Sequence, residues 1–324
     1  MKAYRAHRLA GPQSLALEEA EVPEPGFGEL VVAVEAAGLH LADLAAVSGE
    51  RLPRPGLPFT PGLEVAGKIA AVGDGTVGFE PGQSVVAFVP WGGLAERVIA
   101  RAETCVALPD RLTPLQAAAL PVAYAGALLA LAGKAGPGVN VLVLGAGAQA
   151  GLAAVWVAKA LGARVIGVST GEDRLAHARE HGADDVIDAG LAALASAVGE
   201  LTDEKGVEFV FDPVGGDASA AALDALASGG CLISAGFASG KPPVVDVVQL
   251  FSRGGRLLTA NTPFEVARDG AAARMALDCV VAWAASGTLE PRVAAQFAFA
   301  DLRHAFDYVA SRKGSGAVIV RIGD

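Results

Sequence analysis

A glycine-rich turn constrains the fold of this chain more than any other feature. The apolar run 141–144 (VLVL) leads into the turn 145–151 (GAGAQAG), and a helical pattern follows over 151–161. A strand, a G-x-G-x-x-G/A turn and a helix in this order are typical of dinucleotide-binding domains. Glycine lets the backbone turn tightly and approach a pyrophosphate, whose charge is stabilised by the free N–H groups at the helix start. The residues of this turn that we predict to bind a dinucleotide are Gly145, Gly147, Gln149, Ala150 and Gly151.

The sequence around this turn alternates between strand-like and helical segments. Apolar runs are followed by Ala-rich helical stretches, and continuous apolar strands between helices are typical of a parallel sheet covered on both faces. We therefore predict an α/β domain with a doubly wound parallel sheet. Its strands are expected at 141–144, 164–168, 186–187, 207–211 and 231–234, and its helices at 151–161, 172–181, 191–198 and 218–227.

The N-terminal part of the chain has a different pattern. Short β-type runs at 30–34, 64–72, 84–89 and 96–99 alternate with Pro and Gly clusters, which predicts a β-rich barrel or sandwich. After residue 260 we expect a long helix through Trp283, a helix over 301–312 and a strand over 316–322, too few elements for a third domain. The sequence thus predicts a β-rich domain of residues 1–121 and 264–324, with 122–263 inserted as the nucleotide-binding domain.

Composition narrows the functional class. The chain has 324 residues, 52% of them hydrophobic, with a formal net charge of -10 and 3 Cys. This balance excludes a disordered chain and a disulfide scaffold, and it gives no general attraction for nucleic acid or anionic membranes. The basic N-terminus leads into no apolar run, and the apolar stretch 115–133 is interrupted by Gln116 and Pro121, so we expect a buried helix there. We predict a cytoplasmic protein that binds small molecules, with no nucleic-acid or membrane partner.

The end of the second predicted strand bears on cofactor choice. NAD-binding domains place a carboxylate about 20 residues after the glycine motif to bind the ribose hydroxyls. Here Ser169 follows the strand and Arg174 comes soon after, a pair that fits a 2′-phosphate. We predict that Ser169 and Arg174 contact NADP(H), while the nearby Glu172 and Asp173 leave NAD open as an alternative.

Several further motifs occur in both parts of the chain: 37–43 (AGLHLAD), 57–67 (LPFTPGLEVAG), 92–96 (GGLAE), 182–187 (GADDVI) and 211–216 (FDPVGG). Together they make the sequence similar to the medium-chain dehydrogenase/reductase superfamily, and within it to the zinc-independent NADPH:quinone oxidoreductases. The resemblance implies a GroES-like catalytic domain with an inserted Rossmann domain, and a homodimer. It also implies cofactor contacts from Gly236 and Phe237, in the turn 236–240, and from Arg312.

The resemblance makes zinc the first question about chemistry. Zinc alcohol dehydrogenases of this superfamily place Cys and His ligands at the positions that are His40 and Leu63 here. A catalytic zinc needs three protein ligands, and leucine offers no lone pair. We therefore expect no metal, although an unfamiliar site formed by His40, Asp43 and Glu64 stays open as an alternative.

Without a metal, the expected reaction is hydride transfer from the nicotinamide to a polarised acceptor whose developing charge is met by a proton or a hydrogen bond. His40 is the candidate proton donor, because an unperturbed imidazole titrates near ~6.5. Asp43 would share its face of a short helix and could orient the ring; alternatively, His40 only packs and Asp43 only braces the helix. The leading acceptor is a quinone or another conjugated carbonyl.

Other acceptors and another class of function stay open. Relatives usually carry polar or aromatic residues where this chain has His40, Ala45, Gly126 and Phe237. These changes alter the expected pocket. The alternatives are therefore reduction of an isolated carbonyl, an enone or an enoyl thioester, or a low-turnover NADPH-binding sensor.

Overall fold

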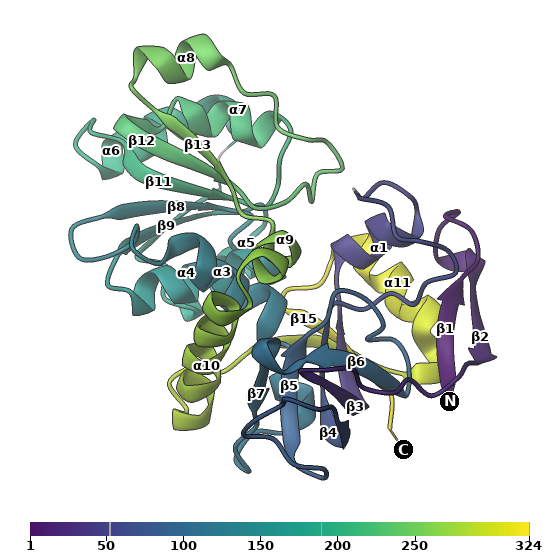
Figure 1. The fold of residues 1–324 in the computed structure, drawn as a ribbon. Coiled ribbons are helices and arrows are strands. Elements are labelled where there is room, and N and C mark those ends of the chain that lie inside the picture. The colour runs from purple at the N-terminus through teal and green to yellow at the C-terminus, as the bar shows by residue number, and fades with distance from the viewer. Residues whose placement is uncertain (52, 189, 324) are drawn as a thin grey trace. The chain divides into compact units, whose positions relative to one another are not determined.

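The computed structural model describes residues 1–51, 53–188 and 190–323. The chain forms two compact units (Figure 1): unit 1 is Met1–Ala125 with Pro263–Asp324, and unit 2 is Gly126–Thr262. The chain therefore passes between units at 125/126 and 262/263, where the sequence predicts 121/122 and 263/264.

Unit 2 is built on a six-stranded parallel sheet in the order β10-β9-β8-β11-β12-β13. The chain runs from β8 outward through β9 to β10, then returns to β11 and runs outward through β12 to β13, so the order reverses between β8 and β11. This confirms the predicted doubly wound sheet. The strands are β8 (Asn140–Leu144), β9 (Arg164–Val168), β10 (Asp185–Ile187), β11 (Val207–Asp212), β12 (Leu226–Ser234) and β13 (Arg256–Thr259).

Apart from α3, which precedes β8, the helices of unit 2 fall between these strands, as the alternating pattern predicts. The Ala-rich helix α4 packs on α3 and on strands β8 and β9, because small side chains let it approach closely. The predicted helix 218–227 is wrong at its C-terminal end: α7 ends at Leu223, and Leu226 already pairs with Val207 of β11, because sheet pairing overrides the helix propensity of alanine. The helices are α3 (Gly126–Leu131), α4 (Gln149–Ala160), α5 (Glu172–Glu180), α6 (Leu194–Leu201), α7 (Asp217–Leu223) and α8 (Val247–Ser252).

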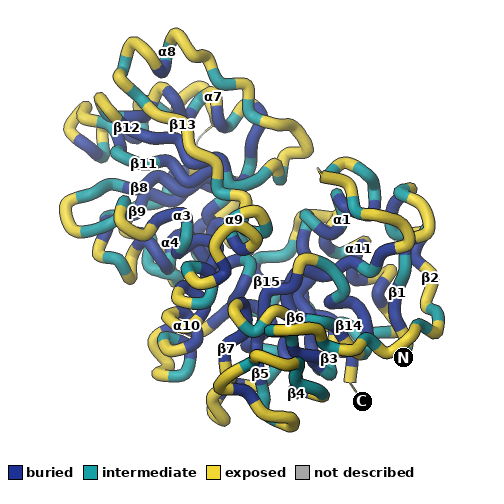
Figure 2. Tube along the Cα trace, in the orientation of Figure 1, coloured by how far each residue is buried: buried dark blue, intermediate teal, exposed yellow. Residues whose placement is uncertain are grey.

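Unit 1 contains a larger, mostly antiparallel sheet and a separate two-stranded sheet, β1 with β2. The large sheet has the order β14-β15-β3-β4-β5-β7, and β6 also pairs with β3. Buried aliphatic side chains of these strands form one core with α11, and Figure 2 shows this interior in dark blue. The strands are β1 (Lys2–Ala6), β2 (Leu15–Glu19), β3 (Glu29–Leu39), β4 (Glu64–Val72), β5 (Ser84–Phe88), β6 (Arg97–Arg101), β7 (Cys105–Ala107), β14 (Val293–Ala298) and β15 (Ala317–Arg321).

The helices of unit 1 include the long helix and the C-terminal helix that the sequence predicts. They are α1 (Leu41–Val47), α2 (Pro114–Ala117), α9 (Thr262–Arg268, which begins on the last residue of unit 2), α10 (Gly270–Ser286) and α11 (Leu302–Ser311). By length and composition, the stretch Pro114–Leu131 could cross a membrane, and 72% of it is buried inside the structure. It is buried as predicted, but it is not one regular helix, because the π-helical turn η3 (Pro121–Ala125) separates α2 from α3.

Candidate active site

The glycine turn of unit 2 is too crowded for side chains. A Cβ on Gly151 would lie 2.1 Å from the carbonyl oxygen of Gly145, and one on Gly147 would lie 2.4 Å from the Cβ of Arg174. Gly145 has a φ of +63°, in the left-handed region that favours glycine. The three glycines therefore let the turn close on itself and on the start of α5, leaving bare backbone at the start of α4.

This turn lies at the carboxyl edge of the parallel sheet, where the strand order reverses. The N–H of Ala146 donates to the carbonyl of Val168, the last residue of β9, over 2.9 Å. Ser169 follows directly and is 7% exposed. The glycine turn, Ser169 and Arg174 thus lie together, and such a switch point is where open α/β sheets bind ligands.

The loops after β11 and β12 reach the same edge. A Cβ on Gly145 would lie 2.9 Å from Cγ2 of Val214, and one on Gly236 would lie 3.1 Å from the carbonyl oxygen of Pro213. Phe237 is 57% exposed. Gly236 and Phe237 therefore belong to the same group of loops as the glycine turn, whereas Arg312 ends α11 in unit 1.

Gln149 gives a direct sign that the turn accommodates a ligand. Gln149 and Ala150 open α4, and the cap residue Ala148 makes no side-chain hydrogen bond to the helix. The Nε2 of Gln149 is buried and has no hydrogen-bond partner among the described residues. A buried amide donor without a partner is costly, so its place at this helix start fits an oxygen-rich ligand such as a dinucleotide pyrophosphate.

In unit 1, a second group of polar side chains forms where β3 and β4 meet. His40 follows the last residue of β3 and is the N-cap of α1, and Glu64 is the first residue of β4. The strands are antiparallel with Ala37 opposite Val65, which brings the end of β3 beside the start of β4. His40 Nε2 consequently lies 2.6 Å from Glu64 Oε1. His40 is 8% exposed and Glu64 is fully buried.

The surroundings of Glu64 show that its carboxylate is built into the site. Its second oxygen, Oε2, accepts the backbone N–H of Val122 over 2.6 Å. A Cβ on Gly38 would lie only 1.8 Å from Glu64 Oε1, so the absence of a side chain at 38 makes room for the carboxylate. From the sequence, Glu64 is considered only as a member of an unfamiliar metal site and not as the partner of the His40 ring. The sequence does carry one indication of this role. Glu64 is a charged residue between the apolar Leu63 and Val65, and a buried carboxylate needs hydrogen-bond partners.

Asp43 binds backbone rather than the imidazole ring. Its Oδ2 accepts the N–H of His40 and its Oδ1 accepts the N–H of Gly62, each over 2.9 Å. Full burial raises the pKa of Asp43, against the opposing effects of His40 and the two backbone hydrogen bonds. Asp43 therefore fixes the first turn of α1, and the carboxylate that contacts the ring belongs to Glu64.

The residues present do not fit the zinc site of the superfamily's alcohol dehydrogenases. Leu63 is buried and offers no lone pair at the position of the second ligand. Both oxygens of Asp43 and one of Glu64 are held by backbone N–H groups. Within residues 1–51, 53–188 and 190–323, no group of three His, Cys, Asp or Glu side chains is arranged to hold a metal ion.

Two family models match successive parts of the chain. The alcohol dehydrogenase GroES-like domain matches residues 26–110, and the zinc-binding dehydrogenase domain matches residues 150–280. The quinone oxidoreductase of Pseudomonas aeruginosa is 33% identical over 316 residues, covering 96% of each chain. A quinone oxidoreductase-like protein 2 homolog of Nematostella vectensis is 32% identical over 300 residues, covering 91% of this chain and 82% of that one.

Comparison with solved structures finds similar proteins. A mycobacterial protein complexed with NADPH matches with a TM-score of 0.92 at 30% identity, over 99% of this chain and 100% of that one. The Escherichia coli quinone oxidoreductase complexed with NADPH matches with a TM-score of 0.91 at 26% identity, with the same coverage. The GroES-like and Rossmann architecture is thus confirmed, and the chain belongs to the quinone oxidoreductase-like oxidoreductases of the medium-chain dehydrogenase/reductase superfamily.

Proposed function

We propose that this protein transfers hydride from NADPH to a quinone or another conjugated carbonyl compound, without a metal ion. The observation that carries this proposal is the glycine turn at the switch point, where the buried Gln149 Nε2 has no partner among the described residues. The names of its relatives and the NADPH held by two neighbouring structures support the same cofactor and acceptor class.

The cofactor is bound mainly by unit 2. The N–H groups at the start of α4 receive the pyrophosphate, with Gln149 donating to one of its oxygens. Arg174 supplies a cation next to the turn, since its Cβ lies where a side chain on Gly147 would point. With Ser169 it favours the 2′-phosphate of NADPH over the bare ribose of NADH. Gly236, Phe237 and Arg312 complete the proposed contacts.

NADPH supplies the hydride, and the residues of unit 1 handle the proton. The buried Glu64 carboxylate holds the ring of His40 through Nε2 and fixes its orientation. His40 then donates a proton to the oxygen of the reduced acceptor. Asp43 contributes by fixing the start of α1, which sets where the imidazole lies.

An acceptor panel tests the reaction. NADPH consumption is measured spectroscopically with quinones, enones and simple aldehydes at matched concentrations. Quinones or enones should give the highest kcat/KM. An equal preference for simple aldehydes would favour a general carbonyl reductase, and no oxidation with any acceptor would favour an NADPH-binding sensor.

Cofactor preference has its own matched test. Arg174→Ala should weaken NADPH binding about tenfold or more while leaving NADH binding nearly unchanged, because one charged contact to the 2′-phosphate is lost. Arg179→Ala is the control, since Arg179 lies on the same helix and pairs with Glu172 at the surface over 2.6 Å. If Arg174→Ala leaves the ratio of NADPH affinity to NADH affinity unchanged, another residue must contact the 2′-phosphate.

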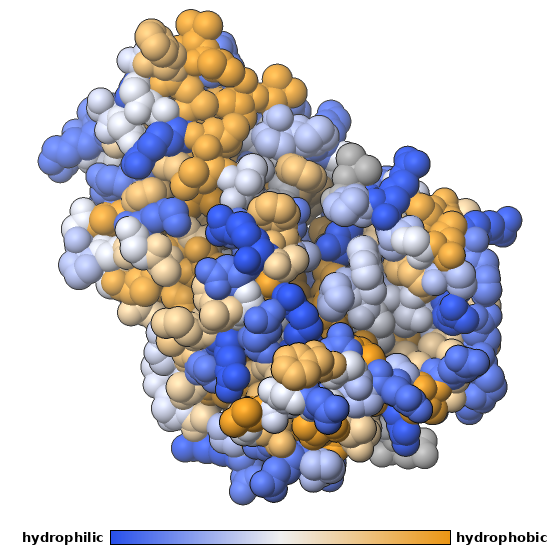
Figure 3. Space-filling view, viewed as in Figure 1, coloured by the Kyte–Doolittle hydropathy of each residue, from blue (hydrophilic) through white to orange (hydrophobic). Residues whose placement is uncertain are grey.

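We also infer a homodimer through the outer edge of unit 2. Every residue of β13 is exposed, with Leu257 and Leu258 at 44% and 40%. Figure 3 shows an apolar surface over β13 and α8, where Phe251 is 86% exposed. An uncovered edge strand can pair with a second copy of itself. Leu258→Lys should therefore reduce the mass measured by light scattering from dimer to monomer, and a monomeric wild type would contradict this.

A further inference from the structure

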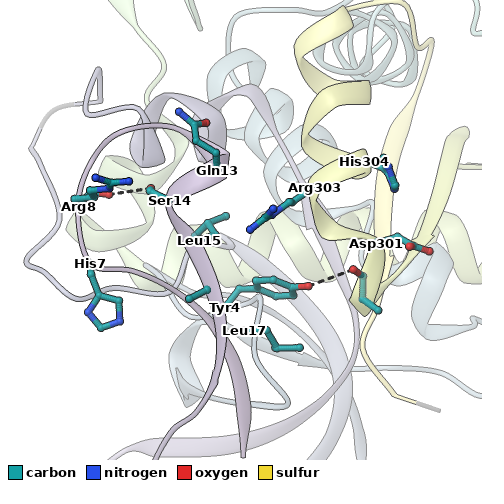
Figure 4. A pocket seen from close by; sticks show the side chains of 12 residues that line it. Tyr4, His7, Arg8, Gln13, Ser14, Leu15, Leu17, Asp301, Arg303 and His304 are labelled. Carbon is teal, nitrogen blue, oxygen red and sulfur yellow. Dashed lines mark hydrogen bonds between the residues drawn. The ribbon is translucent and has the colours of Figure 1, made fainter.

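Unit 1 contains a cavity that shares no residue with the candidate active site or the glycine turn. It has a volume of about 690 Å³ and lies between the β1–β2 hairpin and the start of α11 (Figure 4). One wall includes the short helix η1 (Pro12–Ser14) between β1 and β2; the other includes the end of the turn η5 (Phe299–Asp301) and the first residues of α11. Its volume is within the range of small-molecule sites.

The floor of this cavity is apolar and held in place. Tyr4 and Leu15 are buried there, at 7% and 3% exposure. The Tyr4 hydroxyl donates to the carbonyl oxygen of Ala300 over 3.3 Å, and its ring meets Phe299 edge to face, with the ring centroids 5.0 Å apart. The floor thus offers a fixed aromatic surface before any ligand arrives.

The walls carry two arginines that are not paired with acids. Arg8 lies on the η1 side and Arg303 on the α11 side, and neither guanidinium has a carboxylate within 4.0 Å in the described part of the chain. Figure 4 shows the side chain of Arg303 extending from α11 toward the opposite wall, above the ring of Tyr4.

The acids near the cavity do not cancel these two cations. Glu18 binds Arg5 over 3.2 Å and His7 over 2.9 Å, and the His7 hydrogen bond, with a smaller effect of Arg5, lowers the pKa of Glu18. Asp301 is the carboxylate in the lining. With Arg8 and Arg303 against Asp301, the lining carries one net positive charge in a chain whose net charge is -10, which favours an anionic ligand.

The backbone that carries both arginines is anchored. Ser14 Oγ donates to the carbonyl oxygens of Arg8, over 3.0 Å, and Gly11, over 2.6 Å, and the Gly11 N–H donates to the carbonyl of Val47 in α1. On the other side, Phe306 of α11 is fully buried in the core of unit 1. The backbone is thus fixed before an anion binds, and the two exposed arginine side chains are the parts that must order around it.

We propose that this cavity binds a small organic anion whose carboxylate or phosphate group lies between Arg8 and Arg303 and whose apolar body packs on Tyr4 and Leu15. Guanidinium groups bind such oxyanions through paired N–H donors. The first turn of α11 adds a positive end of a helix dipole beside them.

Calorimetric titration with phenyl phosphate tests this proposal, with and without saturating NADP(H) to separate the cavity from the phosphate-binding glycine turn. One molecule of phenyl phosphate should bind in the presence of NADP(H), whereas the uncharged benzyl alcohol should not. Arg303→Gln should weaken binding about tenfold, the effect of losing one charge-assisted contact. Arg321→Gln, an exposed arginine of unit 1 outside the lining, should leave the affinity unchanged.

A second variant, expected to change the affinity in the opposite direction, shows whether weaker binding by Arg303→Gln is only the result of misfolding. Asp301→Asn should tighten binding severalfold, because it removes the acid in the lining, and the Asp301 side chain makes no capping hydrogen bond to α11. The proposal is overturned if phenyl phosphate shows no saturable binding with NADP(H) present, or if Arg303→Gln and Asp301→Asn both bind it as the wild type does.

Discussion

The glycine turn of unit 2 and the His40–Glu64 pair of unit 1 are built in different ways. The turn consists of seven consecutive residues and presents backbone N–H groups, so its geometry depends on the absence of side chains. The pair consists of two side chains, one directly after β3 and one at the start of β4, and depends on sheet register. A site made of local backbone can be recognised from a short motif, whereas a site made of distant side chains depends on the whole sheet.

The largest effect is expected in the glycine turn. Gly151→Ala places a Cβ 2.1 Å from the carbonyl oxygen of Gly145, so the turn must open. We expect a loss of about 3 kcal/mol in the free energy of unfolding, measured with urea, and a loss of NADPH binding.

Gly136→Ala is the matched control for that substitution. Apart from the adjoining residues, the nearest atom to its Cβ would be the carbonyl oxygen of Leu161 at 4.0 Å, so both stability and NADPH affinity should stay close to wild type. If Gly151→Ala and Gly136→Ala behaved alike, crowding within the glycine turn would not be the reason that position 151 is glycine.

A somewhat smaller effect is expected at the buried pair. Glu64→Ala leaves His40 and the Val122 N–H without their buried acceptor, which should cost about 2 kcal/mol of stability and lower turnover about tenfold or more. Glu18→Ala is the control, because Glu18 also binds a histidine, His7, but in an exposed pair. Equal losses in the two variants would mean that burial does not distinguish the pairs.

Glu64→Gln separates stability from chemistry at the same position. The amide keeps the volume and one hydrogen-bond acceptor, so more of the stability should be retained than in Glu64→Ala. Turnover should still fall, because a neutral amide is a weaker hydrogen-bond acceptor than a carboxylate and holds the imidazole less firmly. Wild-type kcat in this variant would remove Glu64 from the mechanism.

The smallest expected effects concern how the free energy of unfolding depends on pH, which should differ between an aspartate of unit 2 and one of unit 1. In unit 2, burial acts to raise the pKa of Asp184, but hydrogen bonds from Lys159 and the Val165 N–H outweigh it and lower the pKa below its ordinary 3.8. This aspartate therefore stabilises the fold above pH 3.8, and the stabilisation is lost as the pH falls through its folded pKa. The stability advantage of the wild type over Asp184→Asn should shrink on acidification.

Asp43 in unit 1 should show the opposite slope. Burial raises its pKa above 3.8, so its pH-linked contribution is fully present below pH 3.8 and is lost as the pH rises through the folded pKa. The stability of the wild type relative to Asp43→Asn should therefore increase on acidification. Urea unfolding of both variants across this pH range checks the signs, and parallel slopes would contradict the difference between the two sites.

Much of unit 2 could be predicted from the sequence, because its signals are local. After Arg164, β9 contains only apolar residues and glycine, since both faces of a parallel sheet are covered, and the glycine motif needs only its neighbours. In unit 1, β14 was missed, because its sequence VAAQFA is dominated by alanine and shows little alternation. Its identity as a strand comes from pairing with β15.

The candidate site was predicted only in part, for the same reason. His40 was singled out by its chemistry, but its contact with Glu64 depends on the register that sets Ala37 opposite Val65. Asp43 was expected near the imidazole, and it lies near but binds the backbone of His40 instead. Spacing along a short helix indicates proximity, whereas the choice between ring and backbone depends on the conformation of the cap.

NADPH oxidation by metal-depleted protein tests most directly whether the reaction proceeds without a metal. The protein is treated with a chelator, its residual metal content is measured, and NADPH consumption is followed with a quinone before and after zinc is added. We predict that the depleted protein retains its full rate and that zinc does not increase it. A rate that disappears with the metal and returns with zinc would contradict metal-free hydride transfer.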